Sequence, residues 1–245
     1  MTSNALEWLR QHLDVLVSTG ELSPADASVV WLAVNLGWFY LLRSSEFLPM
    51  PGREEKALRG EDLELRRDNQ RCSLKEAEEL VLMIRSSKTD QLGFGCVRNQ
   101  YQTGCVCCPV QAVREFGKHF PERLTGGDRH LPLLRFKDGR PFTRALLQQY
   151  LRISAIGIGQ DPDRIGGHSL RIGGATAMYH ALGDLQAVRR YGRWSSDAFH
   201  LYLWEGSEQQ KGVGEKMATD KMNLRAPSMQ EGAKDQKRVR FKTMG

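Results

Sequence analysis

A histidine and an arginine stand three positions apart in the second half of the chain, at His168 and Arg171. Side chains three apart on an α-helix lie on one face, so these two can contact the same ligand. Trp194 and Tyr202 follow further along the chain. An imidazole, a guanidinium and an indole N–H together suit a phosphate, because all three donate hydrogen bonds to its oxygens. A tyrosine beside that phosphate would be a nucleophile.

A second arginine follows a long apolar segment upstream. Residues 29–42 are almost entirely apolar, too few to span a membrane but enough for a buried helix. We expect this helix to run straight into Arg43, which would then lie at the edge of the core, where weak solvation strengthens its attraction for an anion. Glu46, one turn later, would hold the guanidinium in place. Taken alone, the pair fits a solvated ion pair worth a few tenths of a kcal/mol better than a functional site.

A predicted hairpin supplies one more cation. Residues 80–85 and 93–98 have the composition of two strands, and turn-forming residues at 86–91 join them. Lys88 falls at the tip, where its ammonium could reach a site from the side. Most lysines at hairpin tips only face water, so Lys88 by itself is a weak signal.

Five short strings carry a resemblance to a known family. In chain order they are LLRSSEFL, SSKTDQ, CCPV, GGHSLRIGGATAM and YGRWSSDAFHLYL. Together they resemble the tyrosine recombinase (phage integrase) family over about residues 5–204. They are most similar to its eukaryotic, retroelement-borne branch (DIRS-like and Crypton-like). The step of eight residues from Trp194 to Tyr202 is usual in that branch, whereas many bacterial members have nine.

The resemblance implies an α+β, mainly helical fold, the tyrosine recombinase catalytic-domain fold with a small antiparallel sheet. Residue patterns place the sheet at about 61–100. They predict helices at 4–18, 24–44, 109–119, 142–153, 168–182, 184–191 and 196–204. Gly173 and Gly174 are unfavourable inside a helix, by about 1 kcal/mol each, so we expect another backbone or DNA to pack closely there.

The domain organisation follows from the same comparison of strings. The catalytic domain is expected at 1–206, without the N-terminal core-binding domain that closes around the duplex in family members. Residues 207–245 are expected to form a flexible basic tail. Val213, Met217 and Leu224 are spaced like one helical stripe, so a short helix there is a candidate for docking on a neighbouring protomer.

The family's reaction is a transesterification at a DNA phosphodiester through a 3′-phosphotyrosyl intermediate. The resemblance assigns catalytic roles to Arg43, Lys88, His168, Arg171, Trp194 and Tyr202, with Glu46 in support. The two guanidinium groups would stabilise the charge of the transition state, because guanidinium stays charged and binds two oxygens at once.

The remaining roles follow from side-chain chemistry. Trp194 would orient a non-bridging oxygen as a donor, and His168 would transfer a proton beside the nucleophile. Lys88 would protonate the departing 5′-oxygen, and neighbouring cations would activate Tyr202. No metal and no cofactor is expected. An isolated tyrosine at this position would more often be a half-buried aromatic packed on Phe199, so the assignment depends on the other elements.

Charge is distributed unevenly along the chain, whose formal net charge is +6. Residues 110–195 hold fourteen basic and seven acidic side chains, and residues 211–245 hold nine and four. We therefore expect a DNA-facing surface near the site, although a solvated face with a chance imbalance gives the same count. The candidate DNA-binding residues are Arg190, Arg193, Lys237, Arg238 and Arg240. The last three could equally form a nuclear address.

Neither a signal peptide nor a membrane-spanning run is visible, so a soluble intracellular protein is expected. Its location would be the nucleus, or the nucleoid or cytoplasm of a prokaryote. Five cysteines without a secretory signal indicate reduced thiols. Cys96, Cys105, Cys107 and Cys108 could in principle bind zinc, but the C-x-C-C spacing is not that of a zinc site, and packed or exposed thiols fit better.

Three functional hypotheses remain. The first is a DNA breaking-rejoining enzyme, a site-specific recombinase or integrase that acts on double-stranded DNA and self-associates on it as a dimer or tetramer. The second is a domesticated or truncated DNA-binding module without catalysis, against which the intact set of six site residues argues. The third is an activity like that of type IB topoisomerases, which share the chemistry without a site preference.

Overall fold

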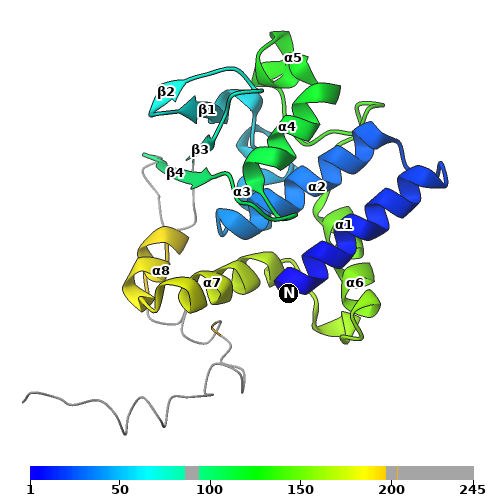
Figure 1. The fold of residues 1–245 in the computed structure, drawn as a ribbon, viewed down its shortest axis with the longest axis vertical. Helices are drawn as coiled ribbons and strands as arrows, with labels where there is room; N and C mark the ends of the chain where they lie inside the picture. The colour runs from blue at the N-terminus through cyan, green and yellow to red at the C-terminus, as the bar shows by residue number, and fades with distance from the viewer. Residues whose placement is uncertain (86–93, 197–202, 204–245) are drawn as a thin grey trace, which may run out of the picture. The chain divides into compact units, whose positions relative to one another are not determined.

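The computed structural model of the protein describes residues 1–85, 94–196 and 203. The chain divides into two compact units, Met1–Trp204 and Glu205–Gly245, and the described residues all belong to the first. The unit is mainly helical with one small antiparallel sheet, as the sequence predicts (Figure 1). None of the helices within the described ranges is long and apolar enough to cross a membrane.

The elements follow the predicted order closely. The α-helices are α1 (Ser3–Ser18), α2 (Pro24–Phe39), α3 (Ser44–Phe47), α4 (Pro109–His119), α5 (Pro121–Leu124), α6 (Arg144–Gly157), α7 (Ser169–Leu182) and α8 (Leu185–Gly192). The strands are β1 (Leu63–Arg67), β2 (Gln70–Arg71), β3 (Glu79–Ile84) and β4 (Cys96–Tyr101), and four short 3₁₀ helices lie at Glu54–Lys56, Gly60–Asp62, Gly127–His130 and Pro162–Arg164. The helix predicted at 196–204 lies largely outside the described residues.

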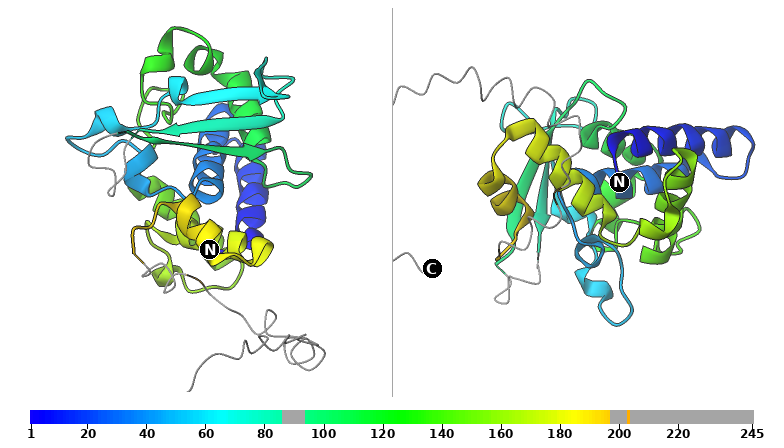
Figure 2. Two further views of the ribbon diagram at one scale, coloured as in Figure 1. Left: turned by 90° about the vertical axis from the view of Figure 1, so that its left-hand side faces the viewer. Right: turned by 90° about the horizontal axis from the view of Figure 1, so that it is seen from below.

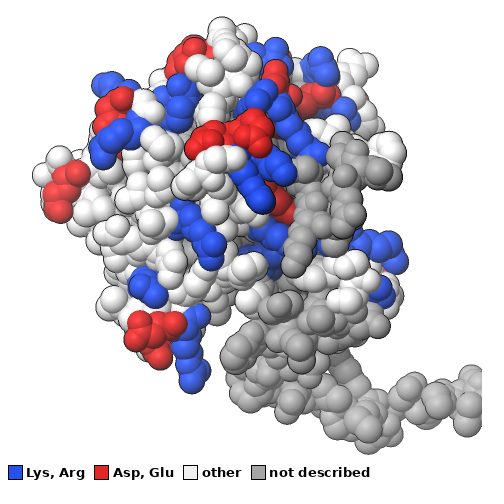
Figure 3. Space-filling view, turned by 180° about the vertical axis from the view of Figure 1, so that it is seen from behind, with Lys and Arg blue, Asp and Glu red and all other residues white. Residues whose placement is uncertain are grey.

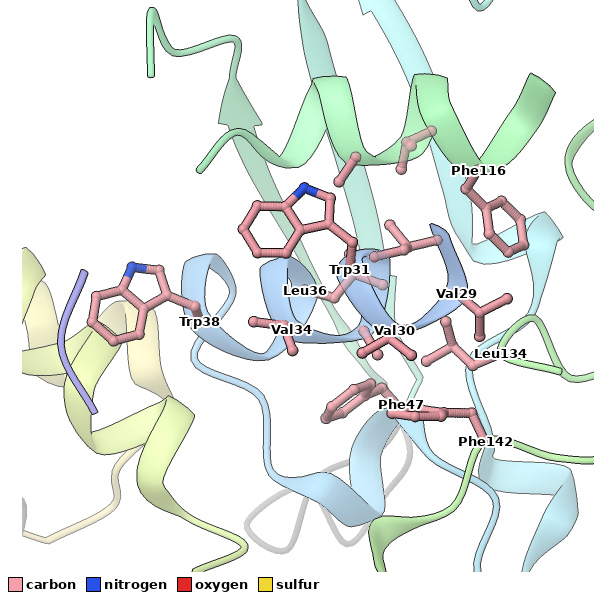
Figure 4. Close-up of a cluster of buried hydrophobic side chains, with 14 of the residues drawn as sticks. Val29, Val30, Trp31, Val34, Leu36, Trp38, Phe47, Phe116, Leu134 and Phe142 are labelled. Carbon is pink, nitrogen blue, oxygen red and sulfur yellow. The ribbon is translucent and has the colours of Figure 1, made fainter. Parts of the chain in front are cut away.

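Helix α2 forms the centre of the core. Ser23 caps it by accepting a hydrogen bond from the backbone N of Asp26 at 3.0 Å, and Pro24 occupies the first turn, where its missing N–H costs nothing. The helix carries apolar side chains around its whole circumference, which is typical of a helix buried within a domain. Helices α1, α4, α6 and α7 pack around it, and Figure 4 shows Trp31 and Leu36 of α2 among buried side chains of other elements.

The sheet has the strand order β2-β1-β3-β4 with every pair antiparallel. Leu80, Leu82 and Ile84 of β3 are buried, and α2 and α4 lie behind the sheet in the left view of Figure 2. The edge strand β4 also holds the end of α8. Arg98 donates from Nε to the carbonyl of Tyr191 at 3.0 Å and from its terminal nitrogen to that of Arg190 at 2.9 Å.

The expectation that the apolar helix runs straight into Arg43 is wrong. Helix α2 ends at Phe39, and Leu41 takes the left-handed backbone conformation with φ of 50°. A tight turn therefore separates the helix from Arg43, which adopts extended backbone and caps α3. This turn could not be predicted from the residue types, because leucine is neither a turn former nor a residue that favours positive φ.

The close packing expected at the glycines of α7 is confirmed, and the partner is protein backbone. A Cβ at Gly174 would overlap the carbonyl of Trp38, and one at Gly173 would overlap the carbonyl of Met1 and the ring of Trp38. The two glycines thus allow α7 to approach the end of α2, where the turn that precedes Arg43 begins.

We expect Gly174→Ala to destabilise the protein by about 1–3 kcal/mol, because an added methyl in a tight backbone contact forces a shift of the helix. Urea unfolding measures this directly. Gly183→Ala is the comparison at the C-terminal end of the same helix, where nothing lies within 4 Å of an added Cβ and the cost comes from positive φ alone (65°). Equal stability of Gly174→Ala and the parent would contradict the close approach.

Candidate active site around Glu46

Glu46 of α3 is a buried carboxylate, 3% exposed, on which three arginines converge. It accepts hydrogen bonds from the backbone N of Arg43 at 2.9 Å and from the Arg43 guanidinium at 2.7 Å. The guanidinium of Arg193 donates to it at 2.7 Å, and a terminal nitrogen of Arg171 lies 3.8 Å from the same oxygen. Three cations around one carboxylate leave two positive charges in excess, an arrangement suited to an anion.

The three guanidinium groups differ in access to solvent. The Arg43 side chain is 17% exposed, whereas those of Arg171 and Arg193 are 3% and 7% exposed. Arg43 therefore offers the open edge of the cluster, while Glu46 holds the buried part together. Residues far apart in sequence meet here, as the functional interpretation requires.

Arg171 comes from the first turn of α7 and reaches the end of α8. It donates to the carbonyl of Gly192 at 2.5 Å, and its guanidinium carbon lies 4.2 Å from the centre of the Trp194 ring. A cation over an indole face is favourable, and more so when both are shielded from water. Trp194 thus contacts Arg171 through its ring face, and Gly192 is needed there because a Cβ would overlap that ring.

His168 is the residue just before α7, and its backbone oxygen accepts the hydrogen bond from Ile172 at 2.9 Å. Burial lowers the pKa of the imidazole below its usual 6.5, and the cations of Arg144, Arg171 and Arg43 lower that pKa further. The neutral imidazole is therefore favoured at physiological pH, which is the form that can accept a proton.

Arg144 was not predicted as a site residue. It opens α6, and its Nε would lie 2.6 Å from a Cβ at Gly167, so its guanidinium rests on the backbone just before His168. One signal was available in the sequence. An arginine in the first turn of a helix faces the positive end of the helix dipole, an unfavourable place unless an anion compensates.

A pH dependence follows from His168. Because its pKa is lower in the folded than in the unfolded protein, the unfolded state takes up the proton first as the pH falls. We expect His168 to reduce stability as the pH drops through about 6.5, with its favourable contribution present above that value. Urea unfolding of the parent and His168→Gln at pH 5.5 and 7.5 measures the effect, and an identical pH dependence in both proteins would contradict it.

The other predicted site residues lie as follows. Arg190 is exposed on α8, 4.0 Å from Asp184. Arg193 does not fit the expectation of a DNA-facing side chain, because its guanidinium is turned inward to Glu46 and to backbone carbonyls. The positions outside the described residues are Lys88, Tyr202, Lys237, Arg238 and Arg240. Arg85, three positions before Lys88 in the sequence, is held by Asp62 at 2.5 Å and Glu61 at 2.6 Å.

The basic excess of residues 110–195 is only partly available on the surface. Arg123, Arg171 and Arg193 are buried or nearly so and bind carbonyl oxygens of their own chain. On the face shown in Figure 3, basic and acidic side chains are interspersed. Counting charges along the sequence therefore overestimates the positive potential that this stretch presents, because arginine also serves as a buried donor.

The cysteines of the CCPV string differ in their surroundings. Cys108 is buried at the start of α4, where its sulfur accepts hydrogen bonds from the backbone N of Gln111 and of Thr103. Burial raises the pKa of the Cys107 thiol to about 12, which makes it unreactive. In the part of the chain that the structure describes, no group of three or more His, Cys, Asp or Glu side chains is placed to hold a metal ion.

Known proteins resemble this chain in fold rather than in sequence. No family model and no curated protein matches it. Solved structures do: the XerH recombinase bound to its difH substrate before cleavage has a TM-score of 0.57 at 18% identity, and the post-cleavage XerH complex with palindromic difH has 0.60 at 18%. The fold is that of site-specific recombinases. It confirms the predicted fold class.

The coverage of these structures is unequal. The match includes 90% of this chain but 53% of the pre-cleavage XerH chain, and 88% and 52% for the post-cleavage complex. The XerA recombinase matches with a TM-score of 0.54 at 14% identity over 89% of this chain and 62% of its own. The chain thus spans about half of the XerH recombinase. At such identities the likeness concerns the fold.

Glu46→Gln is expected to destabilise the protein by about 3–5 kcal/mol, because it leaves buried guanidinium groups without their carboxylate. Urea unfolding at pH 7 gives the value. Glu78→Gln is the matched control, since it breaks an exposed pair with Arg67 and should cost less than about 1 kcal/mol. If both substitutions cost the same, the convergence of three arginines on Glu46 is not a stabilising feature.

Proposed function

We propose that this protein is a DNA breaking-rejoining enzyme of the tyrosine recombinase type. The observation that carries the proposal is that Arg43 and Arg171 converge on Glu46 with positive charge in excess, while Trp194 lies against Arg171 and His168 is close enough for both cations to lower its pKa. The likeness in fold to XerH supports it, because that recombinase is bound to its difH substrate in both structures.

In the proposed reaction the phenol oxygen of Tyr202 attacks the phosphorus of a DNA phosphodiester, and the bond from phosphorus to the 5′-oxygen breaks. The neutral imidazole of His168 takes the phenol proton, and Lys88 protonates the departing oxygen. Arg43 and Arg171 neutralise the added charge on the non-bridging oxygens. Religation runs through the same steps in reverse, with the 5′-hydroxyl of a DNA end as the attacking group.

The site needs a rearrangement to take part in this reaction. Arg171 is 3% exposed and lies against Trp194, so a phosphate would reach it only after the indole moves from the guanidinium. In the proposed complex Trp194 then turns its N–H toward a phosphate oxygen. We also propose, from the sequence strings, that the chain is nearest to retroelement recombinases, acts in the nucleus and self-associates on DNA. Arg190 and the tail residues Lys237, Arg238 and Arg240 are proposed to contact phosphates.

A nicked suicide duplex tests the proposal. Cleavage close to the nick releases a short fragment, so the covalent protein–DNA adduct accumulates and runs as a shifted band on a denaturing gel. We expect this band with duplexes drawn from a random library. DNA binding without any adduct would favour a binding module. Relaxation of any supercoiled plasmid by the monomer would favour a topoisomerase.

A further inference from the structure

Arg193 occupies a backbone conformation that a different residue would adopt more easily. It ends α8 in the left-handed region, with φ of 61° and ψ of 45°. Glycine is the usual residue at such a helix end because it has no Cβ, whereas other residues are strained there by about 1–2 kcal/mol. An arginine at this position therefore implies that its side chain compensates for the strain.

The Arg193 side chain makes its contacts with one short segment. Its guanidinium donates to the carbonyl of Tyr40 at 3.3 Å, to that of Leu41 at 3.1 Å and to the Glu46 carboxylate at 2.7 Å. The only other acceptor among the described residues is the carbonyl of Tyr191 in its own segment, at 3.4 Å. The guanidinium is a planar fork whose N–H groups lie on separate nitrogens and can reach acceptors at different positions, whereas the N–H groups of an ammonium all lie on one nitrogen.

The segment that Arg193 holds is itself strained. Leu41 has φ of 50°, which is unfavourable for a branched side chain unless the surroundings enforce it. Its side chain is buried with Ala175 and Val188, and its carbonyl is held by Arg193. This turn sets the direction in which the chain leaves α2 and enters the extended backbone of Arg43.

We propose that Arg193 is a positioning residue that fixes the turn over residues 40–46 and thereby the guanidinium of Arg43. It acts through Leu41 and Glu46 and does not contact DNA. Arg193 also lies where the chain leaves α8 and continues toward Tyr202, the proposed nucleophile. The same side chain therefore links the start of this segment to the segment of Arg43. Its consequence for cleavage rests on the proposed function, whereas its effect on the turn does not.

Arg193→Gly separates the side chain from the backbone, because glycine accepts the left-handed conformation. We expect the variant to fold, with amide exchange of a peptide covering residues 40–48 at least about tenfold faster and that of residues 26–36 in α2 unchanged. Cleavage of the nicked duplex should fall about 10–100-fold, since small misplacements of a catalytic group have effects of that size. DNA affinity should stay within about threefold.

Two further variants complete the test. Arg193→Lys keeps the charge but has all its N–H donors on one nitrogen instead of a fork, so it should restore only part of both the protection and the cleavage rate. Arg71→Ala removes an arginine from an exposed pair with Glu64 and serves as the charge control, with exchange at 40–48 unchanged. In an Arg43→Lys background, Arg193→Gly should lower cleavage less than in the parent, because it acts through Arg43.

Two results would overturn the proposal. One is unchanged exchange at residues 40–48 in Arg193→Gly. The other is a loss of DNA affinity with a reduced salt dependence, which would make Arg193 a phosphate contact. If the parent protein forms no adduct at all, the proposed function fails, and the exchange data still decide whether Arg193 holds the turn.

Discussion

Tyr202→Phe is expected to abolish the covalent adduct with the nicked duplex, a reduction by at least about 10³-fold, while DNA binding remains within about twofold. Phenylalanine fills the same space but has no oxygen to attack phosphorus, so no other group can form the phosphotyrosyl bond. The measurement is the shifted band on a denaturing gel, together with a binding titration at fixed salt.

Tyr191→Phe is the matched control for this prediction. The Tyr191 hydroxyl donates to the carbonyl of Phe39 at 3.2 Å and accepts from the side chain of Gln100 at 2.7 Å, so it is engaged within the fold. Burial raises the pKa of this phenol, which makes it a poor nucleophile. The adduct should persist in Tyr191→Phe. Loss of the adduct in Tyr191→Phe alone, with its persistence in Tyr202→Phe, would exchange the two assignments.

Arg171→Ala is expected to lower the cleavage rate by about 10²–10³-fold and to reduce DNA binding only modestly. The rate falls because a donor aimed at the transition-state charge is lost, whereas contacts elsewhere on the DNA backbone remain. Single-turnover cleavage at saturating protein separates the two effects. A cleavage rate equal to that of the parent would remove Arg171 from the site.

Arg171 is buried, so its replacement also affects stability, and a matched pair of variants separates the two roles. Arg171→Lys and Arg123→Lys each replace a buried arginine that donates to backbone carbonyls. Arg123 lies at α5, where it binds the carbonyl of Phe136 and stacks on the Phe120 ring, apart from the cluster around Glu46. Both should unfold more easily than the parent, but only Arg171→Lys should cleave slowly at a temperature where both are folded.

Much of the fold could be predicted from the sequence because its signals are local. Ser23 and Pro24 mark the start of α2, the apolar run predicts its burial, and the branched residues of β3 predict a strand. The close packing at Gly174 could be inferred from the cost of glycine in a helix. These features depend on nearby residues or on one helix and its neighbour.

The parts of the site that escaped prediction depend on distant contacts. The turn at Leu41 exists because Arg193 and the packing of α7 hold a strained backbone, and no residue near Leu41 announces it. Arg193 looked like a surface cation because arginine is usually exposed, yet its side chain completes a buried network. Arg144 reaches His168 from another helix, a juxtaposition that only the fold provides.

In the proposed mechanism Arg43 and Arg171 bind a single phosphate that Tyr202 attacks. The most direct measurement is proteolysis of the gel-purified adduct, followed by mass spectrometry of the peptide that retains a nucleotide. We predict a 3′-phosphate linked to Tyr202, at a yield that drops sharply in both Arg43→Ala and Arg171→Ala. An adduct on any other residue, or an undiminished yield in either arginine variant, would contradict this account.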